Sequence, residues 1–267
     1  MSSRPDTLTE AACVVLGEPS PAAKVDWSRR FAAAWADGRL TVIGQAQPPD
    51  RPSRPPSPQL RPPRDMPKRK PGGAEGRIAF IHAIAHIELN AIDLAWDIVA
   101  RFTDENMPRA FFDDWVRVAR DEAEHFDLLN RRLQDLDAAY GDHPAHDGLW
   151  EAAETTADDL LARLALVPMV LEARGLDTTP VAVRRFRAGG DDATATILER
   201  IGNEEIPHVA AGVRWFRFLC ERRNIDPVAT FHALTRRNFN GRLKPPFNDV
   251  ARTRAGFGEE FYRPLSA

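Results

Sequence analysis

The sequence predicts an all-α protein whose centre is a bundle of four long helices. Two observations lead to this prediction: apolar residues recur every three to four positions over long segments, and no segment alternates as a strand would. Pro108 and Pro180 stand where helices are expected to begin, because the fixed φ of proline suits the first helical turn. The long helices are expected at about 74–103, 108–139, 150–174 and 191–223, with a short extra helix at 180–188.

The composition indicates a soluble chain. Hydrophobic residues make up 43% and charged residues 28%, and the net charge of -3 argues against a wholly basic nucleic-acid binder. Cys13 and Cys220 form no metal-binding or disulfide pattern, which suits the reducing cytoplasm. The N-terminus lacks the pattern of a secretory signal, and no uninterrupted apolar run reaches the roughly 18 residues of a membrane span. We therefore expect a cytoplasmic protein without a membrane helix.

The chain divides into three predicted regions. Residues 1–73 hold two short helices and a proline-rich strap packed on the bundle, residues 74–223 form the bundle, and residues 224–267 form a C-terminal helix near 227–237 with a tail. Thr7, followed three residues later by a glutamate, predicts the start of the first helix, and Gly17 its end. The aromatic residues of the tail are expected to pack back onto the bundle.

The proline-rich strap, residues 47–73, is locally basic. Its prolines exclude a regular helix or sheet, so it is expected to be extended over the domain surface. An extended brace is the simpler interpretation, and a contact with the phosphates of RNA is the alternative. The strap has no aromatic residue on which bases could stack, which disfavours RNA. Its basic residues are Arg51, Arg54, Arg61, Arg64, Lys68, Arg69 and Lys70.

Six ionisable side chains interrupt the apolar faces of the four predicted helices. Positions three, four and seven residues apart share a helix face, and on each face the other positions are almost all apolar. Burying a carboxylate without compensation costs several kcal/mol, so these faces need a partner for their charge. The six residues are Glu88, Glu122, His125, Glu172, Glu205 and His208.

These residues form the same pattern twice, a lone glutamate followed by Glu-x-x-His. The spacing from the lone glutamate to the next is 122 − 88 = 34 in the first half and 205 − 172 = 33 in the second. Such a ligand set is typical of di-iron and di-manganese helix bundles, and carboxylates with imidazoles suit iron or manganese. The pattern predicts two iron ions, with manganese or mixed iron and manganese as alternatives. Four glutamates buried by coincidence, with partners elsewhere, are the competing interpretation.

Within this site the two Glu-x-x-His glutamates, Glu122 and Glu205, are expected to bridge the ions. Glu88 with His125 would then complete one metal, and Glu172 with His208 the other. Asp121 and Glu204 each lie four residues before a ligand histidine and are candidates to orient its imidazole. Glu204 could also replace Glu205 as the ligand, since Pro207 is expected to kink the helix beside His208.

A second group of ionisable residues lies on another face of the first long helix. His82, His86, Asp93 and Asp97 have a spacing that would also suit a metal. Their face points away from Glu88, so we interpret them as surface or helix-contact residues. His143 and His146 are expected to lie in a solvated loop.

Several segments resemble one bacterial family, the ferritin-like group catalogued as domain of unknown function 455. They are HAIAHIELNAIDLAWD, DDWVRVARDEAEHF, LARLALVPMVLEARGLD and GNEEIPHVAAGVRWF, and the tail PPFNDVARTRAGF adds to them. The resemblance covers most of the chain. It implies a ferritin-like four-helix bundle with a di-metal site, but no particular reaction. A more distant likeness is to the ferritin-like di-iron tRNA hydroxylase of methylthio-isopentenyl adenosine.

The function predicted from these features is a di-iron oxidoreductase. It would activate O2 or peroxide on an unknown small-molecule substrate, with RNA as the less favoured substrate. A metal-handling protein or ferroxidase is the first alternative, and an interaction module with a structural metal is the second. A homodimer is one assembly compatible with the sequence.

Overall fold

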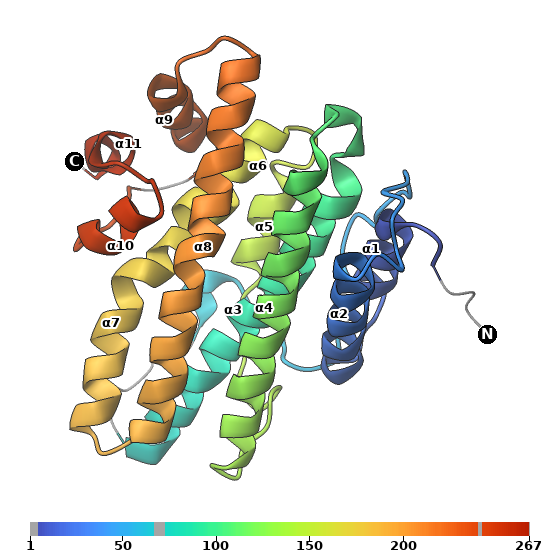
Figure 1. Ribbon diagram of the computed structural model, residues 1–267. Helices are drawn as coiled ribbons and strands as arrows, with labels where there is room; N and C mark the ends of the chain where they lie inside the picture. Colours follow the sequence, from blue (N-terminus) through green and yellow to red (C-terminus); the bar gives the residue numbers. More distant parts are fainter. Residues whose placement is uncertain (1–4, 67–72, 240–241, 267) are drawn as a thin grey trace. The chain divides into compact units, whose positions relative to one another are not determined.

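The computed structural model describes residues 5–66, 73–239 and 242–266. Figure 1 shows an all-helical chain, and the described residues contain no strand beyond an isolated parallel bridge between Leu60 and Ala145. The all-α prediction is therefore confirmed. The chain forms two compact units, Met1–Glu151 and Ala152–Ala267. The predicted division into three regions and the joining of the helices into one four-helix bundle stay predictions.

In the described residues, the first unit is built mainly from α1, α2, α3 and α4. The long helices α3 and α4 lie side by side, α1 packs against α3, and α2 packs against α4 (Figure 1). The expected stripe on α3 is buried, but so is the opposite face, which makes α3 the central helix of this unit. Their bounds are α1 Leu8–Leu16, α2 Pro21–Ala36, α3 Gly73–Arg101 and α4 Arg109–Gln134.

The ends of α1 follow from local sequence chemistry. The Thr7 side chain accepts a hydrogen bond from the backbone N–H of Glu10, and the Glu10 carboxylate accepts from the backbone N–H of Thr7. This reciprocal capping box satisfies donors that the first helical turn leaves open. Gly17 caps the other end, as predicted. The capping box and Gly17 are local, whereas the backbone N–H groups of Leu8 and Thr9 donate to the distant carbonyls of Val42 and Ile43, at 2.8 and 2.9 Å.

The described part of the strap is held on the first unit by backbone bonds and ion pairs. Ser53 N–H donates to the carbonyl of Leu16 (2.7 Å), and Arg61 N–H donates to that of Ala145 (2.8 Å). Arg51 pairs with Asp147, and Arg54 pairs with Asp93. These contacts support the brace interpretation for this stretch. Lys68, Arg69 and Lys70 lie outside the described residues, and a contact between the strap and RNA stays a prediction.

The second unit corrects the prediction of a helix over residues 150–174. Helix α5 ends at Glu154, and a new helix begins after Asp159, whose carboxylate accepts from the N–H groups of Leu161 and Ala162. A helical run then continues to residue 188 through a π-helical segment. Pairwise packing joins α7 to α8 and α6 to α9 (Figure 1). The bounds are α5 Gly148–Glu154, α6 Leu160–Leu166, the π segment Val167–Glu172, α7 Ala173–Ala188, α8 Asp192–Arg222 and α9 Pro227–Asn238.

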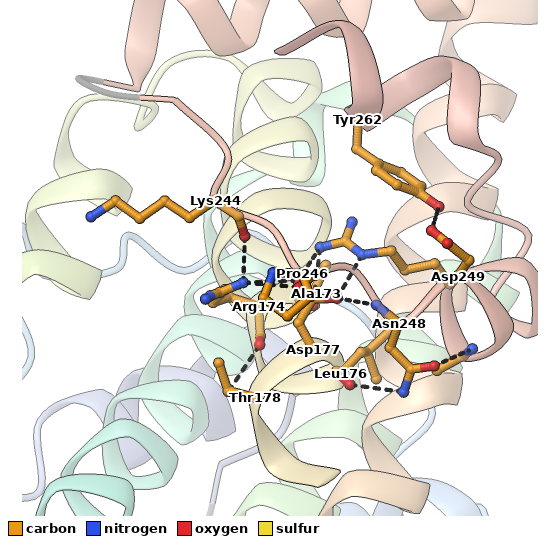
Figure 2. Close-up of polar contacts among 12 residues, drawn as sticks. Ala173, Arg174, Leu176, Asp177, Thr178, Lys244, Pro246, Asn248, Asp249 and Tyr262 are labelled. Atoms are coloured by element: carbon orange, nitrogen blue, oxygen red, sulfur yellow. Dashed lines mark hydrogen bonds and ion pairs between the residues drawn. The ribbon is translucent and has the colours of Figure 1, made fainter. Parts of the chain in front are cut away.

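Pro180 lies inside α7, so the prediction that a separate helix begins there is wrong. Proline has no N–H, and a proline within a helix leaves the carbonyl four residues earlier without its helical donor. That carbonyl belongs to Leu176, and the side-chain amide of Asn248 donates to it at 3.0 Å (Figure 2). The C-terminal tail thus supplies the bond that Pro180 removes, which sequence spacing could not indicate.

Pro207 does not interrupt α8, which runs as an α-helix from Asp192 to Arg222. The departure from α-helical geometry lies instead around Pro168, in the π segment. A β-carbon added to Gly212 of α8 would lie 2.5 Å from the Cβ of Pro168. The π segment and α8 therefore approach so closely that only glycine fits at this contact.

The C-terminal tail packs back onto the second unit, as predicted. The Arg252 guanidinium is buried and donates to both carboxylate oxygens of Asp177, at 2.9 and 2.7 Å. The rings of Phe247, Phe257 and Tyr262 lie within 5.2 Å of the same guanidinium carbon. Asp177 and Asn248 face each other in Figure 2. The tail contains α10 (Asp249–Arg254) and α11 (Glu259–Tyr262), and 3-10 turns lie at Pro63–Asp65, Thr103–Glu105 and Arg263–Leu265.

One helix in the described part of the chain, α3, is long and apolar enough to cross a membrane by length and composition. In the most apolar 18-residue window of this helix, 67% is buried inside the protein. Such burial is consistent with the core helix of a soluble protein. A cytoplasmic location stays a prediction.

Candidate metal centre

Glu88, Glu122 and His125 form a buried group on the facing sides of α3 and α4. Their exposed fractions are 4%, 1% and 0%. Nδ1 of His125 lies 3.3 Å from Oε2 of Glu88 and 3.3 Å from Oε2 of Glu122. One candidate ligand atom from each residue lies within 4.8 Å of the others. This carboxylate–histidine group could hold a metal ion.

The group owes its position to the pairing of the two longest helices of the first unit. Glu122 and His125 share a face of α4 because they are one turn apart, and α3 brings Glu88 to the same imidazole. Apolar neighbours on the same stripes, such as Ile92, Phe126 and Leu129, are buried around it. The sequence prediction that these three side chains lie on buried faces agrees with their burial.

Electrostatics favour a cation at this group. Burial, followed by repulsion from the nearby Glu122, raises the pKa of Glu88 well above its usual value. The imidazole of His125 lies between the two carboxylates but can donate only one Nδ1–H. A divalent cation would supply the positive charge that balances two adjacent buried carboxylates. The donor chemistry of the group thus fits a metal.

The second unit repeats part of the pattern. Glu205 and His208 are buried on one face of α8, with Oε2 of Glu205 3.6 Å from Nδ1 of His208. Glu172 ends the π segment and is only partly buried, unlike the other three glutamates. The two ligand sets are thus present in separate compact units, Glu88, Glu122 and His125 in one and Glu172, Glu205 and His208 in the other. Their assembly into one di-metal site stays a prediction.

Asp121 and Glu204 each lie one residue before a Glu-x-x-His glutamate. Both are only partly buried, whereas the glutamates Glu122 and Glu205 are buried. Each has an arginine partner on its own helix: Arg120 donates to Asp121 at 2.8 Å, and Arg200 donates to Glu204 at 3.1 Å. Glu205 is buried beside His208, whereas the carboxylate of Glu204 is 37% exposed. This contrast favours Glu205 as the ligand. The orienting roles of Asp121 and Glu204 stay predictions.

Comparison with known proteins identifies the family. The family described as "Protein of unknown function (DUF455)" matches residues 17–263, nearly the whole chain. The chain belongs to this family. A relative from Haemophilus influenzae (strain ATCC 51907 / DSM 11121 / KW20 / Rd), named "Uncharacterized protein", is 45% identical over 208 residues, which are 76% of this chain and 72% of that protein. No solved structure gives a significant match.

This DUF455 chain also contains a buried polar network that the sequence spacing only hinted at. It contains four buried side chains of α3, those of His82, His86, Asp93 and Asp97. Their burial excludes the interpretation as surface residues and agrees with the alternative, that they contact other parts of the protein. Asp93 forms ion pairs with Lys24 of α2 and, at 2.6 Å, with Arg54 of the strap. Arg101 donates to Asp97. The spacing on α3 signalled a common face, but not the distant cations.

His86 belongs to this network through the loop that follows α4. Its Nδ1 lies 2.8 Å from the Tyr140 hydroxyl, and its Nε2 lies 3.1 Å from the backbone carbonyl of His146. A neutral imidazole protonated at Nε2 accepts from Tyr140 and donates to the His146 carbonyl, while the Asn90 amide, 3.1 Å from the same Nε2, donates to the backbone carbonyl of His86 at 2.7 Å. His146 is therefore anchored by its backbone. His143 and His146 lie in a loop and are partly exposed, as expected, and this backbone contact also holds the loop against α3.

Stability in this DUF455 protein is expected to fall as the pH drops from about 6.5 to 4. Burial, then the charges of Arg54, His146 and His82, lower the pKa of His86 to about 4. In the unfolded chain His86 binds a proton below about pH 6.5, whereas in the folded chain it does so only below about pH 4. Between these values the proton stabilises the unfolded chain alone, so the free energy of unfolding falls by about 3 kcal/mol. Urea unfolding at pH 7.0 and 4.5 measures this. The His86→Gln variant should lose this part of the slope and His143→Gln should keep it; equal slopes in both would contradict the assignment.

Proposed function

We propose that the protein is a di-metal oxidoreductase that uses O2 or peroxide on a small-molecule substrate. The observation that carries the proposal is the buried group of Glu88, Glu122 and His125, in which two carboxylates share one imidazole nitrogen. Iron or manganese suits such oxygen and nitrogen donors. The proposal assigns this triad to one ion.

The second half of the ligand set is proposed from the repeat. Glu205 and His208 reproduce the Glu-x-x-His contact of α4 on α8, and Glu172 stands where Glu88 stands in the first pair. We assign these three residues to a second ion. Single π-helical turns within longer helices are frequent at functional sites, and Glu172 ends such a segment. That coincidence supports its inclusion as a ligand.

A bound iron or manganese pair would supply redox and Lewis-acid chemistry toward O2 or peroxide. The protein's own residues would hold and isolate it. The carboxylates of Glu88 and Glu122 neutralise positive charge, and His125 contributes a neutral donor. The buried side chains of Ile92, Phe126 and Leu129 keep water away, which strengthens each charge interaction.

Metal analysis and oxygen uptake test this proposal. Protein supplemented with iron or manganese is expected to retain about two ions per chain. After anaerobic loading with Fe(II), mixing with O2 should consume oxygen without forming mineral. Well under one ion per chain would overturn the metal assignment. Growth of a mineral core would instead support a metal-handling protein, and bound metal that does not react would support a structural role.

A further inference from the structure

A groove on the second unit carries charge and contacts that the proposed metal centre does not use. It has a volume of about 330 Å³, within the range of small-molecule sites, and α7, α8 and α10 form its walls. The lining positions of α8, namely 199, 202, 203 and 206, are three or four residues apart and share one face of the helix. Glu205 and His208 lie on a different face of α8, so the groove is separate from the candidate ligands.

The lining of this groove combines positively charged and apolar side chains. Three arginines and one glutamate line it, which gives a formal charge of 3 − 1 = +2, whereas the whole chain carries -3. Arg187 pairs with Glu199 at 2.6 Å. Within the described ranges, the guanidinium groups of Arg184 and Arg254 form no hydrogen bond or ion pair. Two cations from different helices therefore remain available to a ligand in the same groove.

Four apolar side chains of the groove are buried, and hydrogen bonds hold one of its walls in place. Leu176 and Val183 of α7, with Ile206 of α8 and Ala251 of α10, contribute apolar lining and are buried. Buried Arg252 fixes α10 against α7 through its two bonds to Asp177, and Asn248 adds the bond to Leu176 shown in Figure 2. Arg254 is thus presented from an anchored helix. Asn203, which is exposed, adds an amide to the lining.

We propose that this groove binds a small organic phosphate monoester. Guanidinium groups bind phosphate through paired, charge-assisted hydrogen bonds, and two of them match a dianion. The organic part of the ligand would lie on the apolar side chains of Val183 and Ile206. The limited volume favours a small molecule over a polymer.

Calorimetric titration of the full-length protein tests the proposal with four probes: phenyl phosphate, inorganic phosphate, benzoate and phenol. Phenyl phosphate is expected to bind most tightly, because it alone offers both the dianion and the apolar group. Replacing Arg184 and Arg254 with alanine should weaken it by about 10- to 100-fold, the effect of losing charge-assisted bonds. Arg185→Ala is the matched control, since Arg185 is exposed on the same helix but does not line the groove. Equal weakening by the control would overturn the proposal.

A second pair of variants locates the ligand without removing an arginine. Val250 lines the groove and is 72% exposed, so Val250→Asp should fold normally and repel the phosphate. Val181 is 51% exposed on α7 but does not line the groove, and Val181→Asp should leave binding unchanged. Binding that survives Val250→Asp would place the phosphate elsewhere, including at bound metal, and would overturn the proposal. Tighter binding of benzoate than of phenyl phosphate would also overturn the proposal. So would a short RNA that competes for the groove and binds more tightly than phenyl phosphate.

Discussion

The Glu122→Gln variant is expected to lose metal affinity by about 100-fold or more, since changes even to residues behind metal ligands cost 10- to 100-fold. Glutamine keeps the size of the side chain but removes its charge, and Glu122 is 1% exposed beside Glu88. The metal-free variant should be at least as stable as the metal-free wild type, because glutamine removes a buried carboxylate charge that no cation balances there. Loss of metal would then reflect a missing ligand and not a failure to fold.

Metal titration and urea unfolding of the same samples measure both parts of this prediction. Glu124→Gln provides the control, because Glu124 is on the same helix but is partly exposed and bonded to Arg29. That variant should retain wild-type metal affinity. Unchanged affinity in Glu122→Gln would show that Glu122 is not a ligand. Destabilisation of its metal-free form would show that Glu122 has a structural partner in the folded protein.

The Asp93→Asn variant is expected to be destabilised by about 3–5 kcal/mol, the usual cost of breaking a buried ion pair. Asp93 is fully buried and pairs with Lys24, which is 1% exposed. Burial lowers the pKa of Lys24, and the charge of Asp93 opposes that shift. Without the carboxylate, Lys24 would have to bury an unpaired charge or lose its proton, and Arg54 would have no anion at position 93.

A double variant and a surface control make the cause measurable by chemical denaturation. Lys24→Met combined with Asp93→Asn should be more stable than Asp93→Asn alone, because the buried ammonium is gone. Asp26→Asn breaks the exposed pair of Asp26 with Arg30 and should cost at most about 1 kcal/mol. If Asp93→Asn cost no more than Asp26→Asn, the buried network would not stabilise the first unit.

Local and periodic features of the sequence were sufficient to predict much of the fold. The capping box of α1 depends on residues three positions apart, and the stripes of α3, α4 and α8 depend on helical periodicity, so one segment determines each. The same periodicity placed Glu88, Glu122 and His125 on buried faces. These predictions needed no knowledge of distant contacts.

The remaining features depend on partners far away in sequence. The continuity of α7 through Pro180 requires Asn248, and the burial of Asp93 requires Lys24. The π segment packs closely against Gly212, far from Pro168 in the sequence. No local pattern signals such pairings, so the sequence predicted a helix boundary at Pro180 and left surface or helix-contact positions as alternatives on α3. The arginine-lined groove was missed for the same reason, because its walls come from three separate helices.

The bond between Asn248 and Leu176 also bears on the order in which the second unit matures during translation. The two residues are 72 positions apart, so the carbonyl freed by Pro180 stays open until a segment far downstream in the sequence has been made. Proteins are made from the N-terminus, and a domain generally folds as a unit once its segments are available. The nascent chain would carry α7 with an open carbonyl until residue 248 emerges. Closure of α7 is thereby linked to the synthesis of residue 248, and a chain that stops before Asn248 would lack the side chain that supplies this bond.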